Sequence, residues 1–172
     1  MTVRSSIEQA AKSVFGSLST GNEPAADILD TLHEEHEEVQ ELLGKLSESD
    51  DAREQKSLLN KVKQALIPHT KAEEATVYDP VAALKAEKAK IDGAEGYTEH
   101  ALASATLKQL DTLTANSPEF KASAKVLKEL IEHHVKEEER NIWAQVRENF
   151  SAEQREQMNR DFLAAKKRVK VS

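Results

Sequence analysis

The segments HTKAEE at residues 69–74 and HVKEEE at residues 134–139 are two copies of one pattern, a histidine followed four residues later by a pair of glutamates. Each copy is preceded by a Glu-His pair, at residues 35–36 and at residues 99–100. The two histidines of one copy are 33 residues apart in the first half of the chain and 34 in the second. This spacing is typical of successive antiparallel helices joined by a short loop. The repeat therefore predicts four helical segments that bring their polar side chains to one axis.

The composition also favours helices. Charged residues make up 32% of the 172 residues and aromatic residues only 4%, and there are five glycines and four prolines. Residues with high helix propensity therefore dominate, and the predicted fold class is all-α. A chain of this length is expected to form one domain with a substantial core.

The charge balance and the absence of cysteine restrict the partners and ligands. The formal net charge is −7, whereas nucleic acids bind to concentrated basic faces, so we expect no nucleic-acid partner. No apolar run reaches the roughly 20 residues that span a bilayer, and no signal peptide is visible, so we expect a cytoplasmic protein with no membrane partner. Without cysteine, histidine and carboxylate side chains are the candidate metal ligands.

Turn and capping signals divide the chain. We expect an N-terminal extension at 1–22, with the apolar spacing of a short helix over 5–18, a bundle at 23–150, and a C-terminal helix at 151–172 that packs on the bundle or trails it. The last helix should start at the capping box Ser151-x-x-Gln154. The bundle helices are expected at about residues 24–46, from the polar loop at 47–51 to about Val77, at 97–114 and at 118–149, with 80–96 as an irregular connection and Pro68 inside the second helix.

Helical spacing separates inward from outward histidines. His36 continues the apolar stripe of the first helix, whereas His33 shares its face with charged residues and is expected to face solvent. His100 and His134 also continue apolar stripes. His133 is rotated by about 100° from its neighbour, so we expect a residue at the boundary of the core. The less favoured alternative is that it is a ligand itself or contacts one.

Two of the predicted ligand pairs, His69 with Glu73 and His134 with Glu138, lie four residues apart on one helix face. Burying an unpaired carboxylate is costly, so glutamates at apolar stripe positions indicate a nearby cation. One buried histidine is commonly a neutral core residue, but four histidines and two glutamates in a repeated pattern are hard to explain in that way. The predicted metal ligands are His36, His69, Glu73, His100, His134 and Glu138. The next residues, Glu74 and Glu139, are expected to face outward or to contact the ligands.

These motifs resemble those of the hemerythrin-like family, also called HHE cation-binding domains. The resemblance covers about residues 26–150 and rests on residues 28–36, 69–74, 99–100 and 133–139 taken together. It implies an up-down-up-down four-helix bundle, here with a short N-terminal helical extension and an extra C-terminal helix. The bundle is expected to hold a non-haem di-iron site with an oxo or hydroxo bridge. The resemblance assigns the four inward histidines as terminal ligands, and Glu73 and Glu138 as bridging carboxylates.

The chain departs from hemerythrin itself on the third bundle helix. Hemerythrin has a further histidine four residues from its ligand there, but the positions four before and four after His100 are Gly96 and Ser104. One iron is therefore expected to have fewer histidine ligands than the other. We expect its vacant coordination position to be filled by water, by another side chain such as Tyr97, or by an exogenous ligand. Ligand type favours iron(II), with manganese and zinc as alternatives.

The leading functional hypothesis is a cytoplasmic non-haem di-iron protein that binds or senses dioxygen or a related small oxidant. The alternatives are a di-iron enzyme that handles peroxide or nitric oxide, and a metal store or interaction module with a structural metal. Steady turnover would favour the enzyme, and a single stoichiometric oxidation would favour the sensor or carrier. Redox-inert metal would favour the metal store or interaction module. A sensor is expected to act through a separate protein partner.

Overall fold

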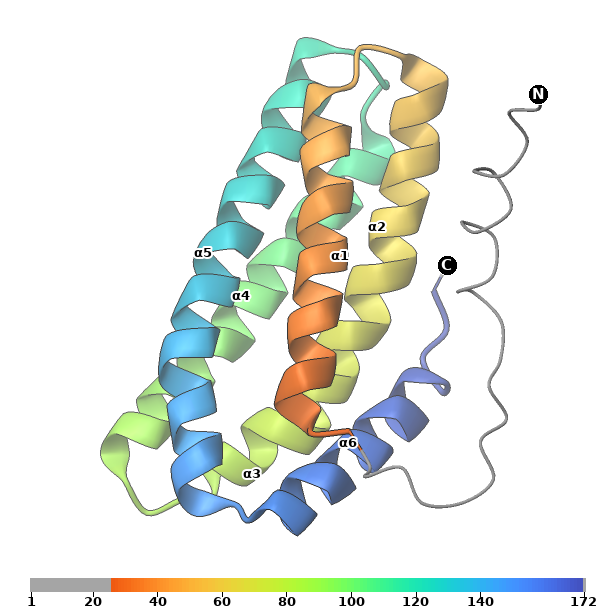
Figure 1. Cartoon of the computed structure of the whole chain (residues 1–172). Coiled ribbons are helices and arrows are strands. Elements are labelled where there is room, and N and C mark those ends of the chain that lie inside the picture. The colour runs from red at the N-terminus through yellow and green to blue at the C-terminus, as the bar shows by residue number, and fades with distance from the viewer. Residues whose placement is uncertain (1–25, 172) are drawn as a thin grey trace, which may run out of the picture.

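The computed structural model describes residues 26–171, which fold into helices without strands (Figure 1). The predicted all-α class is confirmed for this part of the chain. The expected N-terminal extension lies outside the described residues. The elements are α1 (Ile28–Glu48), α2 (Ala52–Glu73), the π-helical segment η1 (Glu74–Tyr78), α3 (Asp79–Ala82), α4 (Glu87–Thr112), α5 (Pro118–Asn149) and α6 (Ala152–Lys166).

Side-chain caps set where the helices begin. Asp27 accepts a hydrogen bond from the Leu29 backbone N–H, so α1 starts at Ile28, later than the expected start near residue 24. The Ser117 side chain caps α5 ahead of Pro118, and Ser151 forms the predicted capping box at the start of α6.

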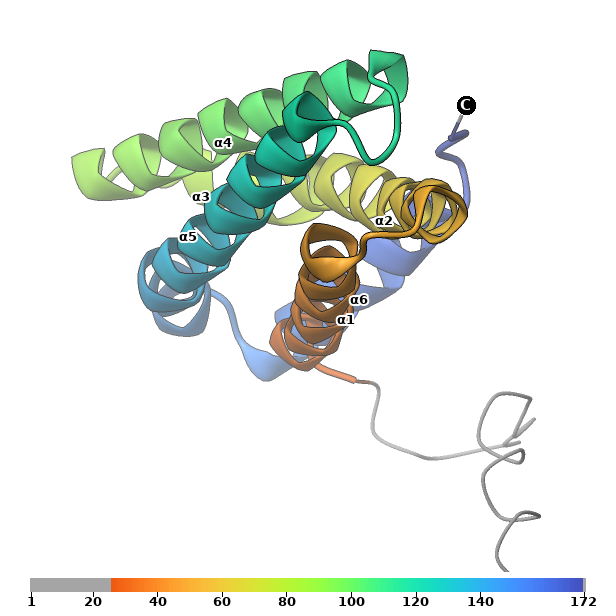
Figure 2. The same cartoon turned by 90° about the horizontal axis from the view of Figure 1, so that it is seen from above.

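The four long helices surround a common axis (Figure 2). Helix α1 packs against α2 and α5, and α4 packs against α5 and α2. Helix α6 lies across one end of this group, against α1 and α2, and α3 packs against α4 near the same end (Figure 1). No helix within residues 26–171 combines the length and the apolarity needed to cross a membrane.

The apolar core is divided into two clusters. One includes Leu43, Val62, Leu107 and Leu127, and the other includes residues of α3 and α6 together with the start of α1 and the end of α5. On each of the long helices, the predicted ligand positions lie where the residues of one cluster give way to those of the other. The polar side chains are therefore enclosed by apolar packing on both sides.

Helix α4 begins ten residues earlier than expected, at Glu87 instead of Tyr97. Gly93 and Gly96 suggested an irregular connection, yet both are buried inside the helix. The reason is space. A β-carbon at residue 96 would lie 2.5 Å from Cε2 of Tyr78, so only glycine lets the helix approach this ring.

The end of the second bundle helix also differs from expectation. After Glu73 the chain continues as the π-helical segment η1 before the short helix α3. The wider turn changes which side chains face the core, so that both Val77 and Tyr78 are buried. The regular helical period predicted only Val77.

The two α4 glycines should respond oppositely to a β-carbon. Gly96→Ala is expected to lower the free energy of unfolding by about 1–3 kcal/mol, because the methyl group overlaps the Tyr78 ring. Gly93→Ala is the matched control: its β-carbon would meet Ala82 Cβ at an ordinary 3.7 Å, and alanine favours the helix by up to about 1 kcal/mol. Urea unfolding of the metal-free protein, followed by circular dichroism, measures both. Equal effects of the two substitutions would contradict the close packing of residue 96.

Candidate metal centre

The structure brings the six predicted ligands together inside the bundle. All six side chains are buried, and Glu73 is 0% exposed. Donor atoms of His36, His69 and Glu73 lie within 4.8 Å of one another, and those of Glu73, His100 and His134 form a second such group. Glu73 belongs to both groups and is therefore placed between two potential cation positions.

Glu138 also connects the two groups. Its Oε2 lies 3.6 Å from His36 Nε2 and 3.3 Å from His134 Nε2. The Nε2 atoms of His100 and His134 are 3.1 Å apart. Each group thus contains two imidazoles, with the two carboxylates between them. We expected one metal ion to have fewer histidine ligands than the other. The two groups instead contain the same number of histidines, and Tyr97 belongs to neither.

Several donor atoms at the centre have no protein partner. His36 Nε2, both carboxylate oxygens of Glu73 and Oε2 of Glu138 are buried without a hydrogen bond. Buried polar atoms are rarely left unsatisfied, because their desolvation is then uncompensated. Imidazole nitrogens and carboxylate oxygens are ligands that suit iron, manganese and zinc ions. The residues present therefore fit a pair of divalent cations.

Every predicted histidine ligand is held through its Nδ1 atom by a glutamate from another element. An ionised carboxylate only accepts hydrogen bonds, so Nδ1 carries the proton and Nε2 is free to bind a metal. The four contacts are His69 to Glu35 at 2.9 Å, His100 to Glu74 at 3.3 Å, His134 to Glu99 at 2.7 Å and His36 to Glu139 at 3.2 Å.

These four outer carboxylates form a closed ring around the bundle. Each of Glu35, Glu74, Glu99 and Glu139 is adjacent in sequence to one predicted ligand and orients the histidine of another element. This explains why a glutamate stands beside a ligand in every motif. Glu74 and Glu139 contact the ligands, which was one of the two expectations for them.

Each outer carboxylate also has a second partner that bears a nitrogen atom, a lysine or a histidine. Lys166 of α6 binds Glu35 at 2.5 Å, and Lys71 binds Glu74 at 2.8 Å. His33 lies 3.1 Å from Glu139. Likewise, His133 lies 3.6 Å from Glu99. The side chains of the two remaining histidines are 51% and 59% exposed, so they support the outer carboxylates and do not enter the centre.

Two aromatic side chains that the sequence patterns did not single out stack on ligand imidazoles. Trp143 stacks on His36 with ring centroids 6.0 Å apart, and its Nε1 donates to Glu138 Oε1 at 3.2 Å. Tyr78 stacks on His100 at 5.1 Å. Each aromatic residue follows a predicted bridging glutamate by five positions, and this repeat is the sequence signal that could have found them.

Tyr97, the expected alternative for the vacant position, is engaged elsewhere. Its hydroxyl lies 2.5 Å from Asp79 Oδ1 and 3.2 Å from the Glu74 carbonyl oxygen, and donates its one proton chiefly to the nearer Asp79 carboxylate. Tyr78, in contrast, is buried among the ligands. Burial and then the charges of Glu138 and Glu73 raise the pKa of Tyr78 well above its ordinary value.

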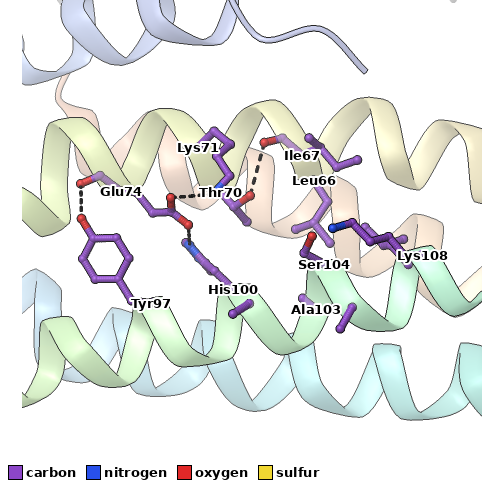
Figure 3. Close-up of a pocket in the computed structure, with 13 residues that line it drawn as sticks. Leu66, Ile67, Thr70, Lys71, Glu74, Tyr97, His100, Ala103, Ser104 and Lys108 are labelled. Atoms are coloured by element: carbon purple, nitrogen blue, oxygen red, sulfur yellow. Dashed lines mark hydrogen bonds and ion pairs between the residues drawn. The ribbon is translucent and has the colours of Figure 1, made fainter. Parts of the chain in front are cut away.

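A cavity of about 460 Å³ runs between α2 and α4 and reaches one side of the centre (Figure 3). Its walls include Leu66, Ile67 and Leu107, and it extends to His100 and Glu74. The small side chains of α4 along this face leave the space open. The His100 side of the centre therefore has an approach lined mainly by apolar groups.

The buried charges change the acidity of the metal-free centre. Burial opposes the protonation of His69, but the charge of Glu73 and the hydrogen bond to Glu35 outweigh it and raise the pKa of His69 to about 9. Burial likewise opposes protonation of His134, but its carboxylate partners Glu138 and Glu99 raise its pKa to about 10. Burial favours the neutral carboxyl of Glu73, yet the charge of His69 holds its pKa well below the ordinary value.

The metal-free protein should lose stability as the pH rises above neutrality. His69 and His134 keep their protons to a higher pH when folded than in the unfolded chain, where the ordinary pKa is 6.5. The stabilisation they supply is complete below pH 6.5 and is lost as the pH rises toward 10. Chemical unfolding between pH 6 and 10 measures this loss. The metal-loaded protein is the control and should lose less, because metal-bound nitrogens carry no proton. A flat profile for the metal-free protein would contradict the assignment.

The outer carboxylates should tune metal affinity. Glu35→Gln removes the charge that holds His69 Nδ1, and the expected loss of metal affinity is about 10–100-fold. Glu34→Gln is the matched control, since it makes the same change at the preceding, exposed position. Competition with a chromophoric chelator gives both dissociation constants, and circular dichroism verifies the fold. Equal constants would show that Glu35 does not act on the ligand.

Comparisons with known proteins agree with this geometry. The family model "Hemerythrin HHE cation binding domain" matches residues 27–146. A protein from Nostoc sp. (strain PCC 7120 / SAG 25.82 / UTEX 2576) described as a DNA nickase is 30% identical over 143 residues. The match covers 83% of this chain but only 40% of that relative's length. No solved structure matches. The chain belongs to the hemerythrin HHE cation-binding domain family.

Proposed function

We propose that this chain binds two iron ions with a bridging oxo or hydroxo group, and that the pair binds or senses dioxygen or a related small oxidant. The observation that carries the proposal is the pair of overlapping groups of buried donors, with Glu73 common to both. His36 and His69 would hold one ion, His100 and His134 the other, and Glu73 and Glu138 would bridge them. Family membership and ligand type favour iron over manganese and zinc.

The iron pair, when bound, supplies two electrons to an oxidant. The protein orients the imidazoles through the outer carboxylates, which keep each Nδ1 protonated and each Nε2 directed inward. The apolar clusters on either side limit the access of bulk water. The cavity that reaches His100 offers a small molecule a route to the centre. These features support reversible or single-turnover chemistry with a small ligand.

A second candidate is an enzyme that turns over peroxide or nitric oxide. It is favoured by one observation, that each donor group contains only two imidazoles. Two imidazoles and two shared carboxylates leave coordination positions for exogenous ligands on both ions. A metal store or a module with a structural metal is the remaining alternative, and redox-inert metal would support it.

We further propose that α1, α2, α4 and α5 form the up-down-up-down bundle of the family, and that the protein acts in the cytoplasm with an unidentified protein partner if it is a sensor. A small oxidant is the proposed ligand, in preference to nucleic acid or a membrane. DNA nicking by the Nostoc relative is not transferred to this chain, because the match spans 40% of that protein and the formal net charge here is −7.

Protein purified from iron-supplemented cells should contain about two irons per chain and show oxo-bridge charge-transfer absorption. His134→Ala should lose iron, because it removes a buried donor, while His133→Ala, the exposed neighbour, should retain it. His36→Ala and His33→Ala form a second matched pair. Metal analysis and the absorption spectrum report all four. A colourless wild-type protein, or equal losses within each pair, would contradict the proposal.

The same preparation separates the functional candidates. The reduced protein is mixed with dioxygen, and in a second experiment with peroxide in excess of metal. One stoichiometric oxidation without turnover supports the carrier or sensor. Sustained consumption of peroxide supports the enzyme, and no oxidation supports the store or structural module.

A further inference from the structure

The hydroxyl group of Tyr78 is buried at the centre without a partner. The side chain is 0% exposed, and its oxygen makes no hydrogen bond. A buried hydroxyl of this kind is destabilising unless a ligand or water satisfies it. Replacing it by an apolar group of the same shape would remove that cost. Its presence therefore points to a group that the protein chain itself does not provide.

Two unusual backbone features accommodate this ring. The π-helical segment η1 ends at Tyr78 and turns the side chain inward, and π-helical turns occur frequently at functional sites. Gly96 gives the ring room, since a β-carbon there would lie 2.5 Å from Cε2 and 2.9 Å from the hydroxyl oxygen. The ring itself stacks on His100 with planes 20° apart.

The second copy of the repeat offers a comparison. Trp143 follows Glu138 by five residues, as Tyr78 follows Glu73, and both aromatic rings stack on a ligand imidazole. The Trp143 Nε1–H group donates a hydrogen bond to Glu138 Oε1. The Tyr78 hydroxyl makes no such hydrogen bond, although the Glu138 carboxylate lies near enough to raise its pKa. Both halves therefore stack an aromatic ring on a ligand imidazole, but only the ring of the second half donates a hydrogen bond to a carboxylate of the centre.

A small cavity borders the Tyr78 side chain. This cavity of about 10 Å³ is lined by Tyr78, Gly96, His134 and Glu138, among other residues. That volume is close to the room that one water molecule needs. The carboxylates at the centre only accept hydrogen bonds, and the ligand imidazoles direct their Nδ1 protons outward. With Trp143 engaged and each ligand Nε2 directed at a metal ion, the Tyr78 hydroxyl is the donor left without a partner among the described side chains at the centre.

We propose that Tyr78 recognises the exogenous ligand of the centre by donating a hydrogen bond from its neutral hydroxyl to a small oxygen- or nitrogen-bearing ligand on the His100 and His134 side. This inference rests on the proposed function, since the metal pair is what holds the ligand there. A donor in this position favours ligands whose acceptor atom carries negative charge. Tyr78 is thus a residue that sets ligand preference and not a metal ligand.

The test compares Tyr78→Phe with Tyr97→Phe, a neighbouring tyrosine whose hydroxyl already has partners in Asp79 and Glu74. In the metal-free proteins, Tyr78→Phe should melt at the wild-type temperature or above it, because an unsatisfied hydroxyl is removed. Tyr97→Phe should melt lower, because the hydrogen bond that its hydroxyl donates to Asp79 is lost. This readout does not involve the metal.

The second readout uses azide as the probe. Both variants should keep the wild-type iron content. In the oxidised, iron-loaded proteins, azide titration followed by absorbance should give a dissociation constant raised about tenfold in Tyr78→Phe and unchanged in Tyr97→Phe.

Several results would overturn the inference. Wild-type azide affinity in fully loaded Tyr78→Phe would show that the hydroxyl does not contact the ligand. Loss of iron, or loss of a visible phenolate-to-iron band, would make Tyr78 a metal ligand instead of a donor. A lower melting temperature of metal-free Tyr78→Phe would show that the protein or a bound water already satisfies the hydroxyl. Wild-type protein that takes up no metal would refute the proposed function and this inference together, and metal analysis reveals that before azide is added.

Discussion

The burial of ionisable side chains between apolar clusters is the constraint on which the rest of this structure depends. Glu73 is fully enclosed, and its Oε2 atom lies 3.5 Å from His69 Nε2 and 3.4 Å from His100 Nε2. Carboxylates in such surroundings are costly unless positive charge lies close by. In the metal-free state, the protonated imidazole of His69 supplies that charge. Two bound cations would supply it more fully and would displace that proton.

The ring of outer carboxylates links the geometry of the centre to the assembly of the bundle. Glu35 on α1 orients His69 on α2, and Glu139 on α5 orients His36 on α1. No helix therefore positions its own histidine alone. A ligand reaches its orientation only when the neighbouring helix is docked, so the centre is complete only in the fully packed bundle. Lys166 extends the same dependence to α6, which binds Glu35 from the end of the molecule.

The sequence allowed much of the centre to be predicted, because helical period determines which residues face inward. It separated His36 from His33 and His134 from His133, and local caps at Ser117 and Ser151 placed two helix starts. Other features depend on distances between helices that no local pattern contains. The pairing of each outer glutamate with a particular histidine is one example. Two others are the early start of α4 and the burial of Tyr78, which result from a π-helical turn and from glycines that provide space and do not break the helix.

The two halves of the chain are nearly interchangeable around the centre. His36 and His100 are 64 residues apart, and His69 and His134 are 65 apart. The contact from Glu35 to His69 is repeated from Glu99 to His134. Each helical hairpin thus carries one complete half-set of donors, with its own pair of imidazoles and one carboxylate shared with the other. A single hairpin that paired with a second copy of itself about a twofold axis would present the same inventory of donors, so the centre has the internal symmetry of a dimer within one chain.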